Sequence, residues 1–361
     1  MMDAHNQAMG VDFSWHVPVE GDGRWLSTPA PERSPNWAYH RKVAINAEKL
    51  GFDTILVPTA FSNGQYSLDS PVLDSWTVAT AIATVTPRIR ILVAQRPGLV
   101  NPGVAAMMGA TFDDVSSSRL AYNIVTAGAP GDMEMFGDRL DHDARYRRAA
   151  EYVVLLRRLW TEERVTHRGE FYCLADALLS PKPKQLPPFY LPGASPAAKK
   201  LAAEQADVYL MSAEPLENVK RRVDEMRELA REVNSGLRFG IAGTIICRDT
   251  HEQAWAQAQA MLEHADSMVL KQRMGSGHRT TSVEDAMFRR RGDLKMANNL
   301  WAGMSHLAYG SAYVGAPADI AAMLRTYIEA GVSLIQFYGF PDLEEADRVA
   351  EQILPLLRSG S

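Results

Sequence analysis

The sequence predicts a (β/α)8 barrel, the TIM-barrel fold, with a few insertions. Two observations lead to this prediction. Short apolar stretches rich in β-branched residues alternate with helix-like stretches along most of the 361 residues. No Pro-, Gly- or Ser-rich linker divides the chain, which disfavours the alternative of two doubly wound domains. We therefore expect residues 1–361 to form one domain.

The expected strands are short and bounded by turn residues. They cover residues 11–18, 54–57, 89–94, 120–125, 189–191, 207–211, 238–247 and 332–338. Helices are expected over residues 37–50, 74–84, 102–114, 143–160, 197–205, 215–233, 252–264, 317–330 and 343–357. A small β excursion is expected near residues 166–174. Residues 274–299 are charged and lack a clear period, and we expect a mobile active-site insertion within residues 266–299.

Composition excludes several classes of function. The formal charge of −5 argues against a protein that binds the phosphate backbone of nucleic acids. No stretch approaches the ~20 apolar residues of a membrane span, and no apolar leader is visible at the N-terminus. The two cysteines, Cys173 and Cys247, form neither a disulfide framework nor a metal-ligand pattern. We expect a cytoplasmic protein that contacts neither nucleic acid nor membrane.

In a barrel of this kind, the active site lies at the C-terminal ends of the strands. Here those ends carry Trp15, His16, Thr59, Phe61, Gln95, Arg96, Asn123, Thr126, Gly193 to Ser195, Met211, Thr244 and Tyr338 to Phe340. We find there no paired carboxylates for a glycosidase, no His and Asp cluster for a metal, and no nucleophile elbow. This composition favours a bound cofactor that carries the chemistry, without a metal site.

Two features indicate that the cofactor is anionic. Ser195-Pro196 begins a helix directly after a strand, and the free N–H groups of a helix start bind phosphate well. Arg145-Tyr146 follows the neighbouring strand and can supply a guanidinium and a phenol to the same anion. An ordinary helix cap at Ser195 is the competing interpretation.

At this point the sequence resembles a known family, the luciferase-like, reduced-flavin-dependent monooxygenases, and within it the alkanesulfonate monooxygenase branch. The matching segments keep one order along nearly the whole chain. They are GDG (21–23), LVPT (56–59), AQRP (94–97), NIVT (123–126), DHDARY (141–146), YLPGAS (190–195), LAAEQAD (201–207), RFGI (238–241), NLWAG (299–303) and GFPDLEEADRV (339–349). GEFY (169–172) and PKP (181–183) also resemble pyrimidine and dimethylsulfone monooxygenases.

The resemblance implies a two-component system. A separate NAD(P)H-dependent flavin reductase would supply reduced FMN (FMNH2), and O2 would add to it to form a flavin (hydro)peroxide. That species would oxygenate a small organic substrate, for which an organosulfur compound is one candidate. The resemblance also implies a homodimer or a homotetramer. A deazaflavin (F420)-dependent oxidoreductase of the same superfamily and a catalytically silent flavin-binding homologue remain as alternatives.

The resemblance also assigns roles to residues. Cofactor-binding positions would be Thr59, Ala60, Asn123, Thr126, Arg145, Tyr146, Gly193, Ala194 and Ser195. Of these, Arg145, Tyr146, Ala194 and Ser195 would lie near the phosphate. We place His16, Trp76, Gln95, Arg96, Thr244 and Trp301 at the substrate, and His16, Asn123 and Arg291 in catalysis. Arg291 matches an arginine that closes over the site. Structural roles compete for His16, Arg96, Trp76 and Trp301.

The chain departs from the alkanesulfonate pattern at several positions. Ala242 and Thr244 stand where that branch has an Arg and a His, and Phe340 replaces a Tyr. A Cys in the loop after the second strand is also missing. Since cationic groups are lost, we expect a substrate less anionic than an alkanesulfonate, or one bound by Arg96 and Arg291 instead.

Overall fold

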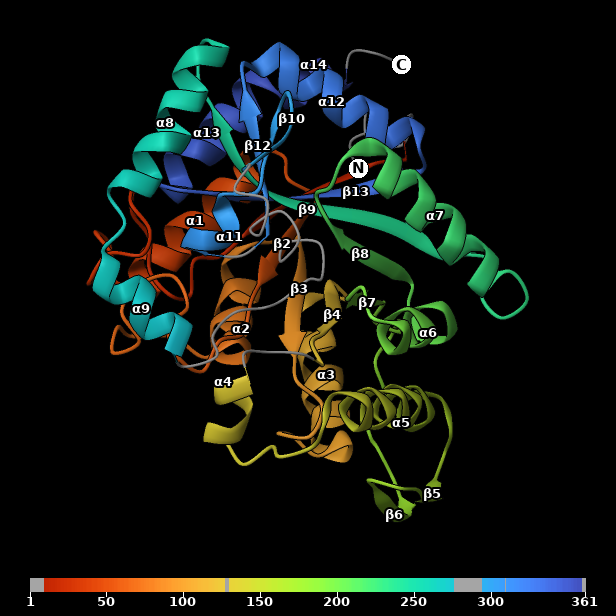
Figure 1. The fold of residues 1–361 in the computed structure, drawn as a ribbon. Coiled ribbons are helices and arrows are strands. Elements are labelled where there is room, and N and C mark those ends of the chain that lie inside the picture. The colour runs from red at the N-terminus through yellow and green to blue at the C-terminus, as the bar shows by residue number, and fades with distance from the viewer. Residues whose placement is uncertain (1–9, 127–129, 276–293, 309, 359–361) are drawn as a thin grey trace.

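A closed barrel of eight parallel strands forms the centre of the computed structural model, which describes residues 10–126, 130–275, 294–308 and 310–358 (Figure 1). The strands are β1 (Asp12–His16), β2 (Thr54–Val57), β3 (Arg90–Gln95), β4 (Leu120–Ile124), β7 (Phe189–Pro192), β8 (Val208–Ser212), β9 (Arg238–Cys247) and β13 (Val332–Gly339). Each pairs with the next, and β13 pairs with both β9 and β1, which closes the ring. The predicted fold class is confirmed.

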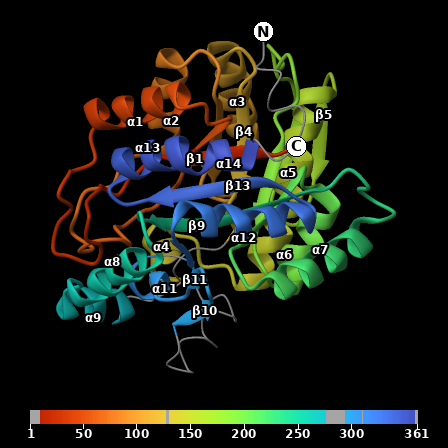
Figure 2. The ribbon, with the colours of Figure 1, turned by 90° about the horizontal axis from the view of Figure 1, so that it is seen from above.

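Helices cover the outside of the barrel, as seen from above in Figure 2. They are α1 (Trp37–Lys49), α2 (Ser75–Val85), α3 (Pro102–Ser116), α5 (His142–Thr161), α6 (Pro196–Gln205), α7 (Leu216–Ala230), α8 (His251–Glu263), α12 (Pro317–Glu329), α13 (Asp342–Gln352) and α14 (Leu354–Arg358). Local chemistry fixes several starts. Asn101, Asp141 and Ser195 each cap a helix by accepting a hydrogen bond from a backbone N–H of its first turn.

The last predicted helix is two helices in the structure. The sequence predicts one helix over residues 343–357, but α13 ends at Gln352 and α14 begins at Leu354. Pro355 explains the break, because proline has no N–H to donate to the preceding turn and its ring crowds that turn.

Additional elements decorate the barrel. They are α4 (Pro130–Met135), the hairpin β5 (Val165–Arg168) and β6 (Cys173–Ala177), α9 (Ser267–Gly275), β10 (Lys295–Ala297), β11 (Leu300–Trp301), α11 (Met304–Leu307) and β12 (Ala312–Gly315). The hairpin confirms the predicted β excursion. The sequence analysis missed α9, which lies within the expected insertion. It also missed α4, β10, β11, α11 and β12, since elements of two to six residues leave little periodicity. Arg291 lies outside the described residues, and mobility of residues 266–299 stays a prediction.

Side chains alternate between two cores. Leu56, Leu92, Tyr190, Leu210 and Leu334 belong to a cluster built from barrel strands alone, which fills the interior. The intervening residues of the same strands pack outward against the helices. Strand register therefore decides which residues at the C-terminal ends face the barrel mouth. None of the described helices is long and apolar enough to cross a bilayer.

Candidate functional site at the mouth of the barrel

Asn123 faces the barrel interior near the end of β4. Its register partners are Ala94 on β3 and Tyr190 on β7, and Tyr190 belongs to the interior cluster. The Asn123 side chain is 9% exposed, and its Oδ1 has no hydrogen-bond partner among the described residues. A buried acceptor without a donor costs about 1–3 kcal/mol, so this atom fits a ligand N–H. Thr126 follows two residues beyond β4 and is buried.

Gly193 and Tyr146 meet at the end of the neighbouring strand, β7. Gly193 has φ +128°, and a Cβ there would lie 3.0 Å from the Tyr146 Oη and 2.7 Å from the Ala198 Cβ. Its carbonyl accepts a hydrogen bond of 2.7 Å from the Tyr209 hydroxyl. Ser195 caps α6, where its side chain accepts from the Ala198 N–H at 3.2 Å. A phenol thus lies beside a tightly packed helix start, and the free N–H groups of a helix start can bind an anion.

Arg145 stands next to Tyr146 in the first turn of α5. It is half-buried and forms no ion pair with any described residue. By contrast Arg147, two residues on, is exposed and pairs with Glu170 at 2.9 Å. Arg145 is therefore a cation near the start of α5 without a direct ion pair among the described residues, although its charge also helps to lower the pKa of Asp138.

Arg96 and Thr59 come together at the ends of β3 and β2. One Arg96 nitrogen donates to the Thr59 carbonyl at 3.3 Å, and another lies 2.9 Å from the Met133 sulfur. The guanidinium also lies 4.6 Å from the centroid of the Phe61 ring. This cluster links the predicted cofactor residue Thr59, with Ala60 beside it, to the predicted substrate residue Arg96.

Thr244 and Trp301 lie in one row of the sheet. Trp301 on β11 is paired with Ala312 on β12, Ala312 with Thr244 on β9, and Thr244 with Tyr338 on β13. Trp301 is buried in a cluster that includes Phe340. The row ends beside His16, whose ring centroid is 5.0 Å from that of Tyr338 and 5.6 Å from that of Phe340.

His16 ends β1 on the inner face, with Leu56 as its register partner. It is 1% exposed, and neither ring nitrogen makes a hydrogen bond among the described residues. Burial, together with a smaller effect of the nearby His40, lowers the pKa of His16 to about 3. The ring is therefore neutral at physiological pH.

Two predicted substrate residues lie on the outer side of the barrel wall. Gln95 is paired with Ile124, which belongs to the core between barrel and helices. Trp76 on α2 packs against Phe112 and Tyr122, with ring centroids 6.0 and 5.4 Å away, in a groove between α2 and α3. Alternation of side chains along β3 turns Gln95 away from the barrel mouth, and Trp76 lies between two outer helices, so neither position supports the predicted contact with substrate.

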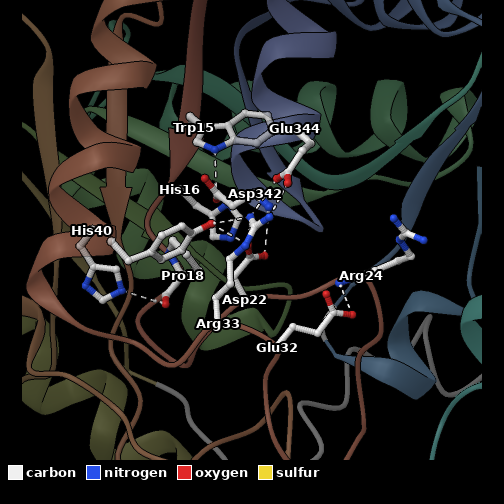
Figure 3. A network of polar contacts seen from close by, with 11 residues as sticks. Trp15, His16, Pro18, Asp22, Arg24, Glu32, Arg33, His40, Asp342 and Glu344 are labelled. Atoms are coloured by element: carbon white, nitrogen blue, oxygen red, sulfur yellow. Dashed lines mark hydrogen bonds and ion pairs between the residues drawn. The ribbon is translucent and has the colours of Figure 1, made fainter.

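A buried polar network at the ends of β1 and β13 was missed by the sequence analysis (Figure 3). The Asp342 backbone N–H donates to Asp22 Oδ1 at 2.9 Å, and Asp342 Oδ2 accepts from Trp15 Nε1 at 3.1 Å. Asp342 Oδ2 also lies 3.5 Å from His16 Nδ1. Asp22, in the loop after β1, and Asp342, the first residue of α13, thus come together near the strand ends, which the sequence analysis did not predict.

The outer end of this network reaches the surface. Asp22 Oδ2 accepts from the Tyr39 hydroxyl at 2.6 Å and from Arg33 at 3.1 Å, and Arg33 also pairs with the exposed Glu344. One signal could have revealed the network. Asp342 follows the last strand after Phe340 and Pro341, so the rule that strand ends build the site extends to it, although not to its partners.

The profile of the luciferase-like monooxygenase family matches residues 11–334. The chain belongs to this family. Solved structures with the same fold include the EDTA monooxygenase from Chelativorans sp. BNC1, with 16% identity, a TM-score of 0.78, and coverage of 97% of this chain and 94% of that one. A riboflavin lyase with modified FMN and riboflavin has 18% identity, a TM-score of 0.77, and coverage of 96% and 91%.

An F420-dependent secondary alcohol dehydrogenase in complex with an F420–acetone adduct also has this fold. It shows 17% identity, a TM-score of 0.69, and coverage of 97% of this chain and 99% of that chain. At these low sequence identities, the structural similarity is evidence for the fold alone. Membership in the luciferase-like family confirms the resemblance at that level, and the alkanesulfonate branch stays a prediction.

Proposed function

We propose that this chain is the oxygenating component of a two-component flavin monooxygenase. It would take reduced FMN from a separate NAD(P)H-dependent reductase and use O2 to oxygenate a small organic substrate. Reduced FMN would supply the electrons that activate O2. The observation that carries the proposal is that the Gly193–Tyr146 seat and the unpartnered Asn123 Oδ1 lie at the ends of two paired strands, β7 and β4.

The residues present fit FMN at both ends. The N–H groups at the start of α6, the Tyr146 hydroxyl and the Arg145 guanidinium suit a phosphate dianion. The Asn123 Oδ1 is an acceptor without a donor among the described residues, which suits an N–H of the isoalloxazine ring. Thr126, Thr59, Ala60 and Ala194 would line the space between these ends.

The substrate would enter on the opposite side of the mouth, near His16, Thr244 and Trp301. Aromatic rings dominate this side, and Ala242 on β9 lacks the cation of the alkanesulfonate pattern. This composition supports a substrate of low negative charge. Arg96, which lies near Thr59, is a cation that could contact such a substrate at the mouth. A closing role for Arg291 and a homodimeric or homotetrameric state are parts of the same proposal.

The first experiment measures binding under anaerobic conditions. Reduced FMN should bind at least about tenfold more tightly than reduced riboflavin, because only FMN carries the phosphate. Arg145→Gln and Tyr146→Phe should each weaken FMN binding and leave riboflavin binding unchanged. The matched control is Arg147→Gln, since Arg147 is exposed and paired with Glu170. Equal affinity for FMN and riboflavin would contradict the phosphate seat.

The second experiment distinguishes the reaction classes. Protein loaded with reduced FMN is mixed with O2 and a panel of organosulfur and other small compounds, and oxygenated product is quantified. Product formation that depends on O2 supports the proposal. Reduction of F420 by an alcohol without O2 would instead indicate the deazaflavin oxidoreductase, and binding of FMN without any product would indicate a silent homologue.

A further inference from the structure

We propose that Asp342 and His16 form a dyad in which a protonated Asp342 carboxyl holds His16 as the Nε2–H tautomer. The barrel mouth then receives a neutral hydrogen-bond donor from His16. Asp342 is a positioning residue in this arrangement, since it acts through the His16 ring. The role of this donor in a reaction rests on the proposed function. The tautomer of His16 does not depend on that function.

The geometry of the strand end makes the dyad possible. Trp15 and His16 are neighbours on β1, so their side chains leave on opposite faces of the strand. Asp342 is the first residue of α13 and lies beyond the end of β1, where one oxygen can reach both side chains (Figure 3). Its Oδ2 lies 3.1 Å from Trp15 Nε1 and 3.5 Å from His16 Nδ1. The second distance is at the outer limit for a hydrogen bond, and the structure records no hydrogen bond there, so the proposed dyad requires the two groups to move closer together.

Hydrogen-bond donors are divided unequally between the two carboxyl groups. Asp22 accepts from the Tyr39 hydroxyl, from Arg33 and from the Asp342 N–H. Burial raises the pKa of Asp22, but these donors and the Arg33 charge oppose that effect. Asp342 accepts from Trp15 alone among the described residues, and its Oδ1 has no partner. The side-chain proton of the pair therefore belongs to Asp342.

The electrostatic setting agrees with this assignment. Burial raises the pKa of Asp342 well above its ordinary range, and the charge of Asp22 raises it further. Burial holds the pKa of His16 near 3, so a positive ring is unfavourable. The titratable groups that face the ring are Asp342 on α13, His40 on α1 and Tyr338 on β13. The pair is therefore neutral His16 beside neutral Asp342.

The tautomer follows from the positions of the protons. The Asp342 hydroxyl donates to His16 Nδ1, which must then present its lone pair, so the single ring proton resides on Nε2. His16 Nε2 has no other partner among the described residues and lies at the mouth beside Tyr338. If the Nε2 proton passes to an oxygen anion in the mouth, the Asp342 proton moves to Nδ1. One proton leaves the pair, and the negative charge remains on Asp342.

The test reads the tautomer directly. The whole chain is labelled with 15N-histidine, and long-range 1H–15N spectra are recorded without flavin or substrate. His16 is assigned among the nine histidines by its absence in His16→Gln. The expected result is a protonated Nε2 and an unprotonated Nδ1 between about pH 5 and 8. A protonated Nδ1, or a fully protonated ring at neutral pH, would overturn the proposal.

A variant extends the same measurement. In Asp342→Asn, the amide oxygen must take the position that accepts from Trp15, so His16 Nδ1 faces an oxygen without a proton. The ring should then switch to the Nδ1–H tautomer. Asp347→Asn is the matched control, because Asp347 is exposed on the same helix and accepts from Asn46 at 2.8 Å. An unchanged tautomer in Asp342→Asn would also overturn the dyad, and neither spectrum depends on whether FMN binds.

Discussion

The two sides of the barrel mouth satisfy their polar groups in opposite ways. On the β4–β7 side, the Asn123 Oδ1 is buried without a donor among the described residues, and Arg145 has no carboxylate partner there. On the β13–β1 side, Asp22 receives donors from three other residues of the chain. The first side is incomplete without a ligand, whereas the second is complete around Asp22 and leaves the His16 ring nitrogens and Asp342 Oδ1 without hydrogen-bond partners among the described residues. The difference indicates that the β4–β7 side binds a ligand and that the β13–β1 side holds side chains in position.

The largest effect should come from breaking the complete side. Asp22→Ala leaves the Tyr39 hydroxyl and the Asp342 N–H without their acceptor, and Arg33 keeps Glu344 and the Tyr39 hydroxyl as partners. We expect the free energy of unfolding to fall by about 3 kcal/mol in urea denaturation. Asp143→Ala removes a carboxylate from an exposed His–Asp pair and should change stability little. Equal effects of the two substitutions would contradict the comparison.

Breaking the phosphate seat should cost both stability and affinity. Gly193→Ala places a Cβ at φ +128°, 2.7 Å from the Ala198 Cβ and 3.0 Å from the Tyr146 hydroxyl. We expect a loss of about 2 kcal/mol in stability and at least about tenfold in reduced-FMN affinity. Gly236→Ala is the control, because a Cβ at that position meets nothing within 4 Å. Unchanged FMN binding in Gly193→Ala would remove the seat from the cofactor site.

The pH dependence of stability sharpens the assignment of His16. Because burial lowers its folded pKa to about 3, far below the unfolded value of 6.5, only the unfolded chain gains this proton on mild acidification. The contribution of neutral His16 is thus complete above pH 6.5 and is lost as pH falls toward 3. The stability difference between the wild type and His16→Gln should shrink by about 2 kcal/mol from pH 6.5 to 5.

The pKa shift of Asp342 changes stability with pH in the direction opposite to that of His16. Measurements on the wild type alone would therefore conceal the effect of His16. Because the pKa of Asp342 is raised in the folded chain, the folded chain keeps this proton at pH values where the unfolded chain has lost it. The contribution of protonated Asp342 to stability therefore decreases as pH rises. The two slopes oppose each other in mildly acidic solution. Denaturation curves of both proteins across this range check the prediction, and a pH-independent difference would contradict a neutral buried His16.

The smallest effect concerns the incomplete side. Asn123→Ala removes a buried acceptor without a partner, so stability should change by less than about 1 kcal/mol while reduced-FMN affinity falls about tenfold. Asn234→Ala should show the reverse pattern, because Asn234 Nδ2 donates to the Ala206 carbonyl at 2.6 Å. Urea denaturation and anaerobic titration of both variants separate a ligand-binding amide from a structural one.

The sequence by itself determined the barrel and much of its mouth. Alternation of strands and helices is a local property, and β2 and β9 have the predicted bounds, Thr54–Val57 and Arg238–Cys247. Local capping chemistry placed the start of α6 after β7, which led to Ser195 and Gly193. The rule that strand ends build the site led to His16 and Asn123.

Only the tertiary structure decided which side chains meet. Asp22 and Asp342 are 320 residues apart and come together because the barrel closes β13 onto β1. Gln95 lies one position beyond the inward-facing Ala94 on β3, so its side chain leaves on the outer face. A strand boundary predicted from sequence is not precise enough to distinguish these two faces. Local pattern specifies elements, but ring closure and strand register specify neighbours. For that reason the network around His16 became visible only in the folded chain.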